Sequence, residues 1–174
     1  MGSHISRARF YSGKLQKYGD KMEVVENEKE DVVKETSDWV EGTYSLESSS
    51  NFDSYLKELG VGFLLRQVAQ VAQPTVTVDR ASSSEEEVWK VHTSTMVRDH
   101  TVTFQLGEEV EDTTLDGRRV ASTFTQGEGN QLVEEQVGMR GSTRLVRTFH
   151  QDRMEVTMQA NLVTANSVFR RTAP

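Results

Sequence analysis

The stretch NFDSYLKELGVGFLLRQVAQVAQPT, residues 51–75, predicts two short helices in a chain whose other segments favour β-strands. Asn51 is suited to cap the first helix, because its side chain can accept a hydrogen bond from a free amide of the first turn. Gly60 can take the left-handed conformation that ends a helix. One apolar face at helical spacing lies between them, made of Phe52, Tyr55, Leu56 and Leu59.

A second apolar helix follows, and Pro74 ends it because proline has no amide to continue the helical hydrogen bonds. Its apolar residues are Phe63, Leu64, Val68, Ala69 and Val71. Two helices this short cannot form a bundle alone. They are therefore predicted to cover another element, and the open end of a barrel is the expected place.

Turn signals recur about every 8–12 residues in the rest of the chain, the spacing of an antiparallel barrel or sandwich. Trp39–Leu46 is the first predicted strand, residues 89–97 alternate as one strand, and Leu162–Arg170 is the last. A closed barrel of about ten strands would leave no free edge and would enclose a cavity beneath the helices.

The composition argues against several classes of protein. The 174 residues amount to about one domain, and their net charge of −7 disfavours a nucleic-acid partner. No apolar run approaches the roughly 18 residues that span a bilayer, and the absence of cysteine fits a reducing compartment. No catalytic or phosphate-binding motif is present. The four histidines lack metal-ligand spacing, so neither an enzyme nor a metal or cofactor site is predicted.

Residues 1–38 differ in character from residues 39–174, the predicted folded domain. Met1–His4, MGSH, is typical of an expression scar. The residues after it are first basic and then acidic, with few large apolar side chains, so we expect a flexible, partly helical extension. Arg9-Phe10-Tyr11-Ser12 resembles the end of a mitochondrial presequence, which makes the mitochondrion an alternative to the cytoplasm.

Three ordered segments resemble those of the intracellular lipid-binding proteins, the group of fatty-acid-binding and cellular retinoid-binding proteins. They are residues 51–75 with the motifs NFD and LGVGF, Phe104–Arg118 with FQLGEE and DTTLDGR, and Leu145-Val146-Arg147. The resemblance implies an all-β fold over residues 39–174: a ten-stranded antiparallel up-and-down, calycin-like β-barrel with a helix-turn-helix lid. It also implies a non-catalytic, monomeric, cytoplasmic carrier of a fatty acid or another hydrophobic ligand, whose lid contacts membrane surfaces transiently.

The resemblance also implies a set of ligand-binding residues. Arg147 matches an arginine that meets a ligand carboxylate, and a guanidinium can hold a carboxylate at two points. An ungapped alignment puts Ser167 and Phe169 where the family has a second arginine and a tyrosine, whereas a longer last hairpin puts Arg170 at the arginine position. The other implied residues are Phe52 and Val97 at the portal, Thr95 on the strand of Val97, and Asp116 and Arg118 in the cavity wall.

The leading hypothesis is a fatty-acid carrier in which burial of apolar surface drives binding at about 25 cal/mol per Å². A retinoid is the alternative ligand, suggested by Leu64–Ala69 and Val97-Arg98. A stress-protective or structural barrel that has lost its ligand is a third reading, because the ungapped alignment lacks the second arginine. As a lone buried charge, Arg147 is expected to cost stability, so that Arg147→Gln would stabilise the fold.

Overall fold

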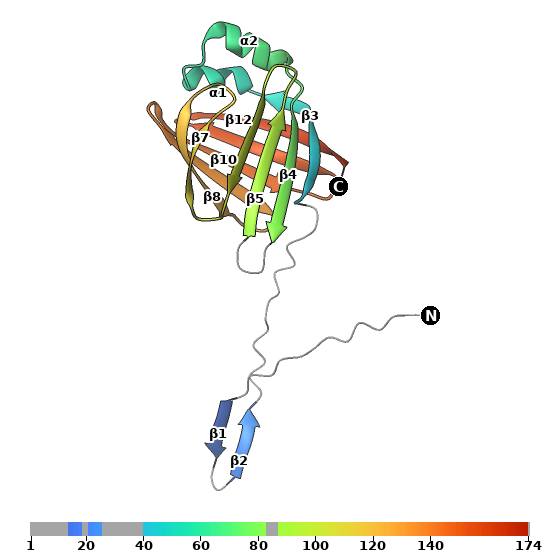
Figure 1. The fold of residues 1–174 in the computed structure, drawn as a ribbon, viewed down its shortest axis with the longest axis vertical. Coiled ribbons are helices and arrows are strands. Elements are labelled where there is room, and N and C mark those ends of the chain that lie inside the picture. Colours follow the sequence, from blue (N-terminus) through green and yellow to red (C-terminus); the bar gives the residue numbers. More distant parts are fainter. Residues whose placement is uncertain (1–13, 19–20, 26–39, 83–86, 174) are drawn as a thin grey trace, which may run out of the picture. The chain divides into compact units, whose positions relative to one another are not determined.

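The computed structural model describes residues 14–18, 21–25, 40–82 and 87–173. The chain divides into two units, Met1–Glu35 and Thr36–Pro174. The first unit contains the antiparallel strands β1 (Lys14–Tyr18) and β2 (Lys21–Val25), drawn in blue in Figure 1. The extension was expected to be partly helical, and this is wrong for Lys14–Tyr18 and Lys21–Val25, which are strands. Arg9–Ser12 and Trp39 lie outside the described residues.

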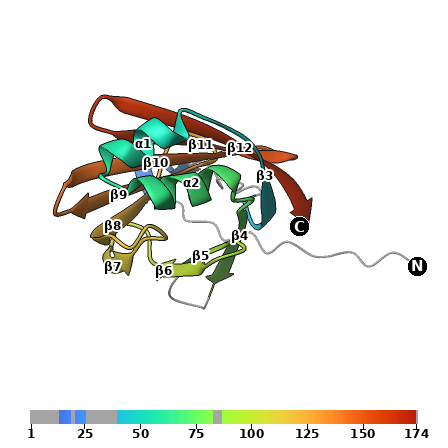
Figure 2. The same cartoon turned by 90° about the horizontal axis from the view of Figure 1, so that it is seen from above.

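The second unit is a ten-stranded antiparallel sheet that curls into a nearly closed barrel, which confirms the predicted fold class (Figure 1). The order of its strands is β6-β5-β4-β3-β12-β11-β10-β9-β8-β7. The strands are β3 (Gly42–Ser50), β4 (Thr75–Ser82), β5 (Glu87–Ser94), β6 (Asp99–Phe104), β7 (Glu109–Thr113), β8 (Arg119–Gln126), β9 (Gln131–Gly138), β10 (Gly141–Phe149), β11 (Arg153–Ala160) and β12 (Val163–Ala173). Two helices, α1 (Phe52–Glu58) and α2 (Phe63–Val71), lie over one end of the barrel (Figure 2).

The strands alternate between the barrel interior and solvent, because successive side chains of a strand point to opposite faces. Tyr44, Val78, Phe124 and Met154 are completely buried, and they belong to one apolar cluster. The rings of Tyr44 and Phe149 pack at 5.8 Å between centroids. The barrel unit therefore contains its own hydrophobic core.

Backbone pairing does not close the barrel. β6 and β7 stand at the two ends of the sheet order, and no ladder joins them among the described residues, so the expectation of a sheet without edges is wrong here. Side chains bridge this seam instead. Phe104 of β6 stacks on Phe124 of β8 at 3.6 Å between centroids, and His100 Nε2 lies 2.8 Å from Asp112 Oδ1 of β7.

The first helix has the apolar face that its sequence predicts. Tyr55, Leu56 and Leu59 are buried, and Gly60 has the expected left-handed conformation with φ 74°. The predicted side-chain cap is wrong, because Asn51 itself has φ 57° and makes no capping hydrogen bond. Its Nδ2 donates instead to the Thr164 carbonyl at 2.7 Å, which anchors the start of the lid to β12.

The second helix is formed but buries none of its residues. It is joined to α1 through Arg66, whose Nε lies 2.9 Å from Asp53 Oδ1 and whose Nη1 donates to the Val61 carbonyl at 3.0 Å. Its large apolar side chains are exposed: Phe63, Leu64, Leu65, Val68 and Val71. No helix in the described part of the chain is long and apolar enough to cross a membrane.

Several strand limits differ from those that the sequence predicts. β3 begins at Gly42 and continues through polar residues to Ser50, and β12 runs on to Ala173. The predicted strand over residues 89–97 is too long, because β5 ends at Ser94 and the chain turns there. A hydrogen bond of 3.1 Å from the Thr95 amide to the Arg98 carbonyl closes this turn.

We expect a chain that begins at Thr36 to unfold at the same urea concentration as the full chain. The buried apolar cluster lies within residues 44–169, so removing residues 1–35 deletes no part of it. Urea unfolding of both chains, with limited proteolysis of the full chain, tests this. A difference of more than about 1 kcal/mol in the free energy of unfolding, which is the size of a typical single-substitution effect, would contradict this expectation.

Candidate ligand-binding site

Two arginines on β10 point to opposite sides of the barrel wall. Arg144 is on the outer face, where its Nη1 donates to Glu135 Oε1 at 2.8 Å. Arg147 is on the inner face, where its Nη1 lies 2.8 Å from Glu134 Oε2. The side chains of Arg147 and Glu134 are only 12% and 4% exposed. The barrel therefore contains a buried ion pair at the position where the sequence implies a ligand-binding arginine.

A line of polar side chains continues from Glu134. Gln136 Nε2 donates to Glu134 Oε1 at 2.6 Å, and Gln136 Oε1 accepts from Thr143 Oγ1 at 3.0 Å. Glu134 and Gln136 share the inner face of β9 because they are two residues apart, and Thr143 faces them from the neighbouring β10. Gln136 thus holds one oxygen of Glu134 while the other faces Arg147.

The turn between β7 and β8 adds a second ion pair to this line. Arg118 Nε donates to Asp116 Oδ2 at 2.7 Å, and Arg118 Nη2 reaches Gln136 Oε1 at 3.4 Å. The Thr114 hydroxyl also donates to Asp116. Asp116 and Arg118, implied as cavity-wall residues, are therefore joined to the pair of Arg147 and Glu134 through one glutamine.

The lid reaches the same place through Tyr55 of α1. Burial raises the pKa of the Tyr55 phenol, and the charge of Arg118 and a hydrogen bond with Thr143 partly offset this rise. The phenol therefore lies among the polar groups beneath the lid. We call the whole set the interior polar cluster; its members are Tyr55, Asp116, Arg118, Glu134, Gln136, Thr143 and Arg147.

The structure has the ungapped arrangement of the last strand. Val156 of β11 is paired with Ser167 and Met154 with Phe169, and both β12 residues are buried. Arg170 lies on the opposite face, where its Nη2 donates to Glu47 Oε1 at 2.7 Å. The alternative with Arg170 in the interior is therefore wrong, because period-two alternation turns it outward.

The implied portal residues lie at the lid end of the barrel, outside the interior polar cluster. Phe52 is half-buried, with its ring 6.2 Å from that of Tyr55. Val97 is 76% exposed in the turn between β5 and β6. The Thr95 hydroxyl is engaged in that turn, where it donates to the Arg98 carbonyl at 2.6 Å. Thr95 and Val97 therefore form a turn at the rim.

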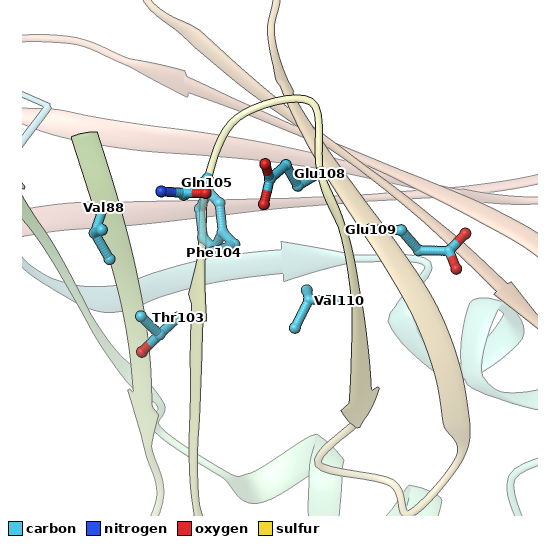
Figure 3. A pocket seen from close by; sticks show the side chains of 7 residues that line it. All are labelled: Val88, Thr103, Phe104, Gln105, Glu108, Glu109 and Val110. Atoms are coloured by element: carbon cyan, nitrogen blue, oxygen red, sulfur yellow. The ribbon is translucent and has the colours of Figure 1, made fainter. Parts of the chain in front are cut away.

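A recess of about 240 Å³ lies at the seam between β6 and β7 (Figure 3). Its lining consists of Val88, Thr103, Phe104, Gln105, Glu108, Glu109 and Val110. No member of the interior polar cluster lines it, and its two glutamates disfavour an anionic ligand. It is therefore a separate feature of the seam.

Sequence reasoning missed three members of the cluster on the barrel wall: Glu134, Gln136 and Thr143. A signal was present in the turn Gly138-Met139-Arg140-Gly141, because a two-residue hairpin loop fixes the register of β9 and β10. In that register Arg144 is directly opposite Glu135, and Arg147 is diagonal to Glu134. The two opposite-charge pairs could therefore have been found, one on each face of the hairpin.

Known proteins are similar to this chain in sequence and in fold. A fatty acid-binding protein of Tyrophagus putrescentiae is 38% identical over 130 residues, which cover 75% of this chain and 95% of that protein. One of Clonorchis sinensis is 35% identical, with coverage of 75% and 96%. The structure of a Schistosoma mansoni fatty acid binding protein in complex with arachidonic acid aligns with a TM-score of 0.74 at 29% identity, over 79% of this chain and 98% of that one.

The sequence profile of the lipocalin / cytosolic fatty-acid binding protein family matches residues 41–171, which contain both lid helices and every strand of the barrel except the last two residues of β12. The ten-stranded barrel and its two helices agree with that match. The chain therefore belongs to the lipocalin / cytosolic fatty-acid binding protein family, whose fatty-acid-binding members are carriers and not enzymes.

Proposed function

We propose that the barrel carries one long-chain fatty acid, or a lipid of similar shape, in the cytoplasm. The observation that carries this proposal is the interior polar cluster, which lies in an apolar barrel beneath a helical lid. Relatives named as fatty acid-binding proteins, one of them solved with arachidonic acid, support it. The cytosolic members of the family favour the cytoplasm.

Binding would proceed by partition from water. An acyl chain that enters the barrel gains about 25 cal/mol for each Å² of apolar surface buried. The polar end of the ligand would meet the interior polar cluster, because a head group buried away from hydrogen-bonding partners costs free energy. Arg147 is the cation of that cluster that lies on β10, and we propose that it orients the head group.

Mass spectrometry of lipid extracted from the purified protein, followed by titration with oleate and retinol, tests the proposal. A stoichiometric fatty acid or acyl lipid, or saturable binding of oleate, is the expected result. Retinol bound more tightly than any acyl lipid would favour the retinoid alternative. A protein that is empty and ignores every ligand would support a barrel that has lost its ligand, the alternative favoured by Ser167 and Phe169.

The lid is also proposed to contact membrane surfaces during ligand transfer. The exposed apolar side chains of α2 include Phe63, Leu64 and Val71. The turn that follows β5, which contains the exposed Met96 and Val97, lies at the same end of the barrel (Figure 1). Contiguous exposed apolar surface of this kind is typical of a membrane or protein contact. The charge of Arg66 is paired with Asp53, so the apolar residues would dominate the contact.

We expect the double substitution Leu64→Ser and Val71→Ser to weaken binding to lipid vesicles by about tenfold or more, because it removes apolar surface that the bilayer would bury. Flotation with vesicles of phosphatidylcholine and phosphatidylserine measures this. Leu106→Ser is the control, since Leu106 is partly exposed on the loop between β6 and β7, which Figure 3 shows at the end away from the helices. Equal losses for both proteins would contradict a contact through α2.

A further inference from the structure

The charge of Arg147 is already matched by a residue of the same chain. Glu134 Oε2 lies 2.8 Å from Arg147 Nη1, and both side chains are buried. Gln136 holds the other oxygen of Glu134 at 2.6 Å and so keeps the carboxylate in place. A ligand carboxylate that approached Arg147 would therefore have to share it with Glu134 or displace Glu134 from it.

The neighbouring charges do not offer a substitute cation. Arg118 is paired with Asp116 at 2.7 Å, so the interior polar cluster contains two arginines and two carboxylates, with a formal charge of zero. Tyr55 is the other titratable member of the interior polar cluster, and burial raises the pKa of its phenol, so it adds no charge. An added carboxylate would leave the cluster with one excess negative charge in an apolar barrel, which is unfavourable.

The last strand does not correct this balance. The inner face of β12 presents Ser167 and Phe169 near the cluster, and the Ser167 hydroxyl lies 2.9 Å from that of Ser49. Arg170 is outside, paired with Glu47. Arg171 shares the inner face but donates to the Glu41 carbonyl and the Tyr44 hydroxyl. The described part of β12 therefore brings no cation to the interior polar cluster.

We propose that Glu134 determines the head-group specificity of this barrel and that the barrel binds lipids with an uncharged, hydrogen-bonding head group in preference to their carboxylates. A hydroxyl can donate to Glu134 and accept from Arg147, so that neither charge loses its partner. Amides, esters and protonated acids can do the same. This inference rests on the proposed function, because it specifies which end group the proposed lipid carries.

Titration calorimetry with oleate and with oleyl alcohol, which differ only in the head group, tests the proposal. The wild type is expected to bind the alcohol at least as tightly as the acid. Glu134→Gln frees Arg147 for the ligand and is expected to strengthen oleate binding by about tenfold or more, since a hydrogen bond to a charged group has roughly that value. The affinity for oleyl alcohol is expected to change by less than about threefold, because an uncharged hydroxyl gains no charge pair with the freed Arg147.

Glu135→Gln is the matched control, because Glu135 is the next residue of β9 and pairs with Arg144 on the outer face. It should leave the affinity of both lipids unchanged. The double variant Glu134→Gln/Arg147→Gln keeps the cluster neutral. It provides the test of the proposal if the single variant does not fold. Its ratio of acid to alcohol affinity is expected to equal that of the wild type.

The outcomes separate this inference from the proposed function. An unchanged acid-to-alcohol ratio in Glu134→Gln, or a selective loss of oleate by about tenfold in the double variant, would show that Arg147 binds the acid without competition from Glu134 and would overturn the inference. The carrier function would still stand. If neither lipid bound any of the proteins, the proposed function itself would fail, and the inference with it.

Discussion

Arg147→Gln is expected to lower the free energy of unfolding by about 3–5 kcal/mol, because it leaves Glu134 buried without its counter-ion. The two side chains are 12% and 4% exposed, so water can replace little of the lost interaction. The sequence alone led to the opposite expectation, since it showed Arg147 as a lone buried charge. Urea unfolding of the ligand-free proteins, monitored by circular dichroism, measures the change.

Two further variants make this result specific. Arg144→Gln removes the outer arginine of the same strand, whose pair with Glu135 is more than half exposed, and should change stability by less than about 0.5 kcal/mol. Glu134→Gln/Arg147→Gln should recover much of the loss, because no unpaired charge remains. Equal destabilisation by Arg144→Gln and Arg147→Gln would show that burial of the pair is not the cause.

Phe124→Ala is expected to cost about 3–5 kcal/mol of stability, because the ring is fully buried and its removal leaves a cavity. The ring also stacks on Phe104, so its loss removes one of the contacts that bridge β6 to the far side of the seam. We therefore expect amide exchange in β6 and β7 to accelerate more than in β11. Urea unfolding and hydrogen exchange provide the two measurements.

Phe63→Ala is the control for that prediction. Phe63 is 63% exposed on α2, so its removal deletes a ring of the same size without opening a cavity. Its effect on the unfolding free energy should stay within about 0.5 kcal/mol. Uniform acceleration of exchange over all strands in Phe124→Ala would mean that the residue supports the whole barrel and has no particular role at the seam.

The sequence predicts the elements of the lid well, because a helix with one apolar face has a clear local pattern. Tyr55, Leu56 and Leu59 repeat at helical spacing and are buried against the barrel. The large apolar residues of α2 have the same kind of pattern, yet they are exposed. Local spacing thus predicts the helix and its apolar face, but whether that face is covered depends on elements distant in sequence.

The candidate site was less predictable, because it depends on register. Whether Arg170 or Ser167 faces the interior depends on the length of one hairpin loop, since a shift of one residue exchanges the two faces of a strand. Glu134 and Glu135 are adjacent and chemically identical, and only pairing with β10 separates the buried one from the exposed one. The family resemblance indicated Arg147 but carried no information about its counter-ion.

The residue pattern did not predict the strand β7, and the composition of this strand explains why. Three of its five residues, Glu109, Glu111 and Asp112, are acidic, which hides the apolar alternation of a strand. β7 is also one end of the sheet, so its free backbone groups could recruit a strand from a second molecule. Acidic side chains along such an edge repel an identical strand from another copy. The seam can therefore lack a ladder without becoming a template for fibrous self-association.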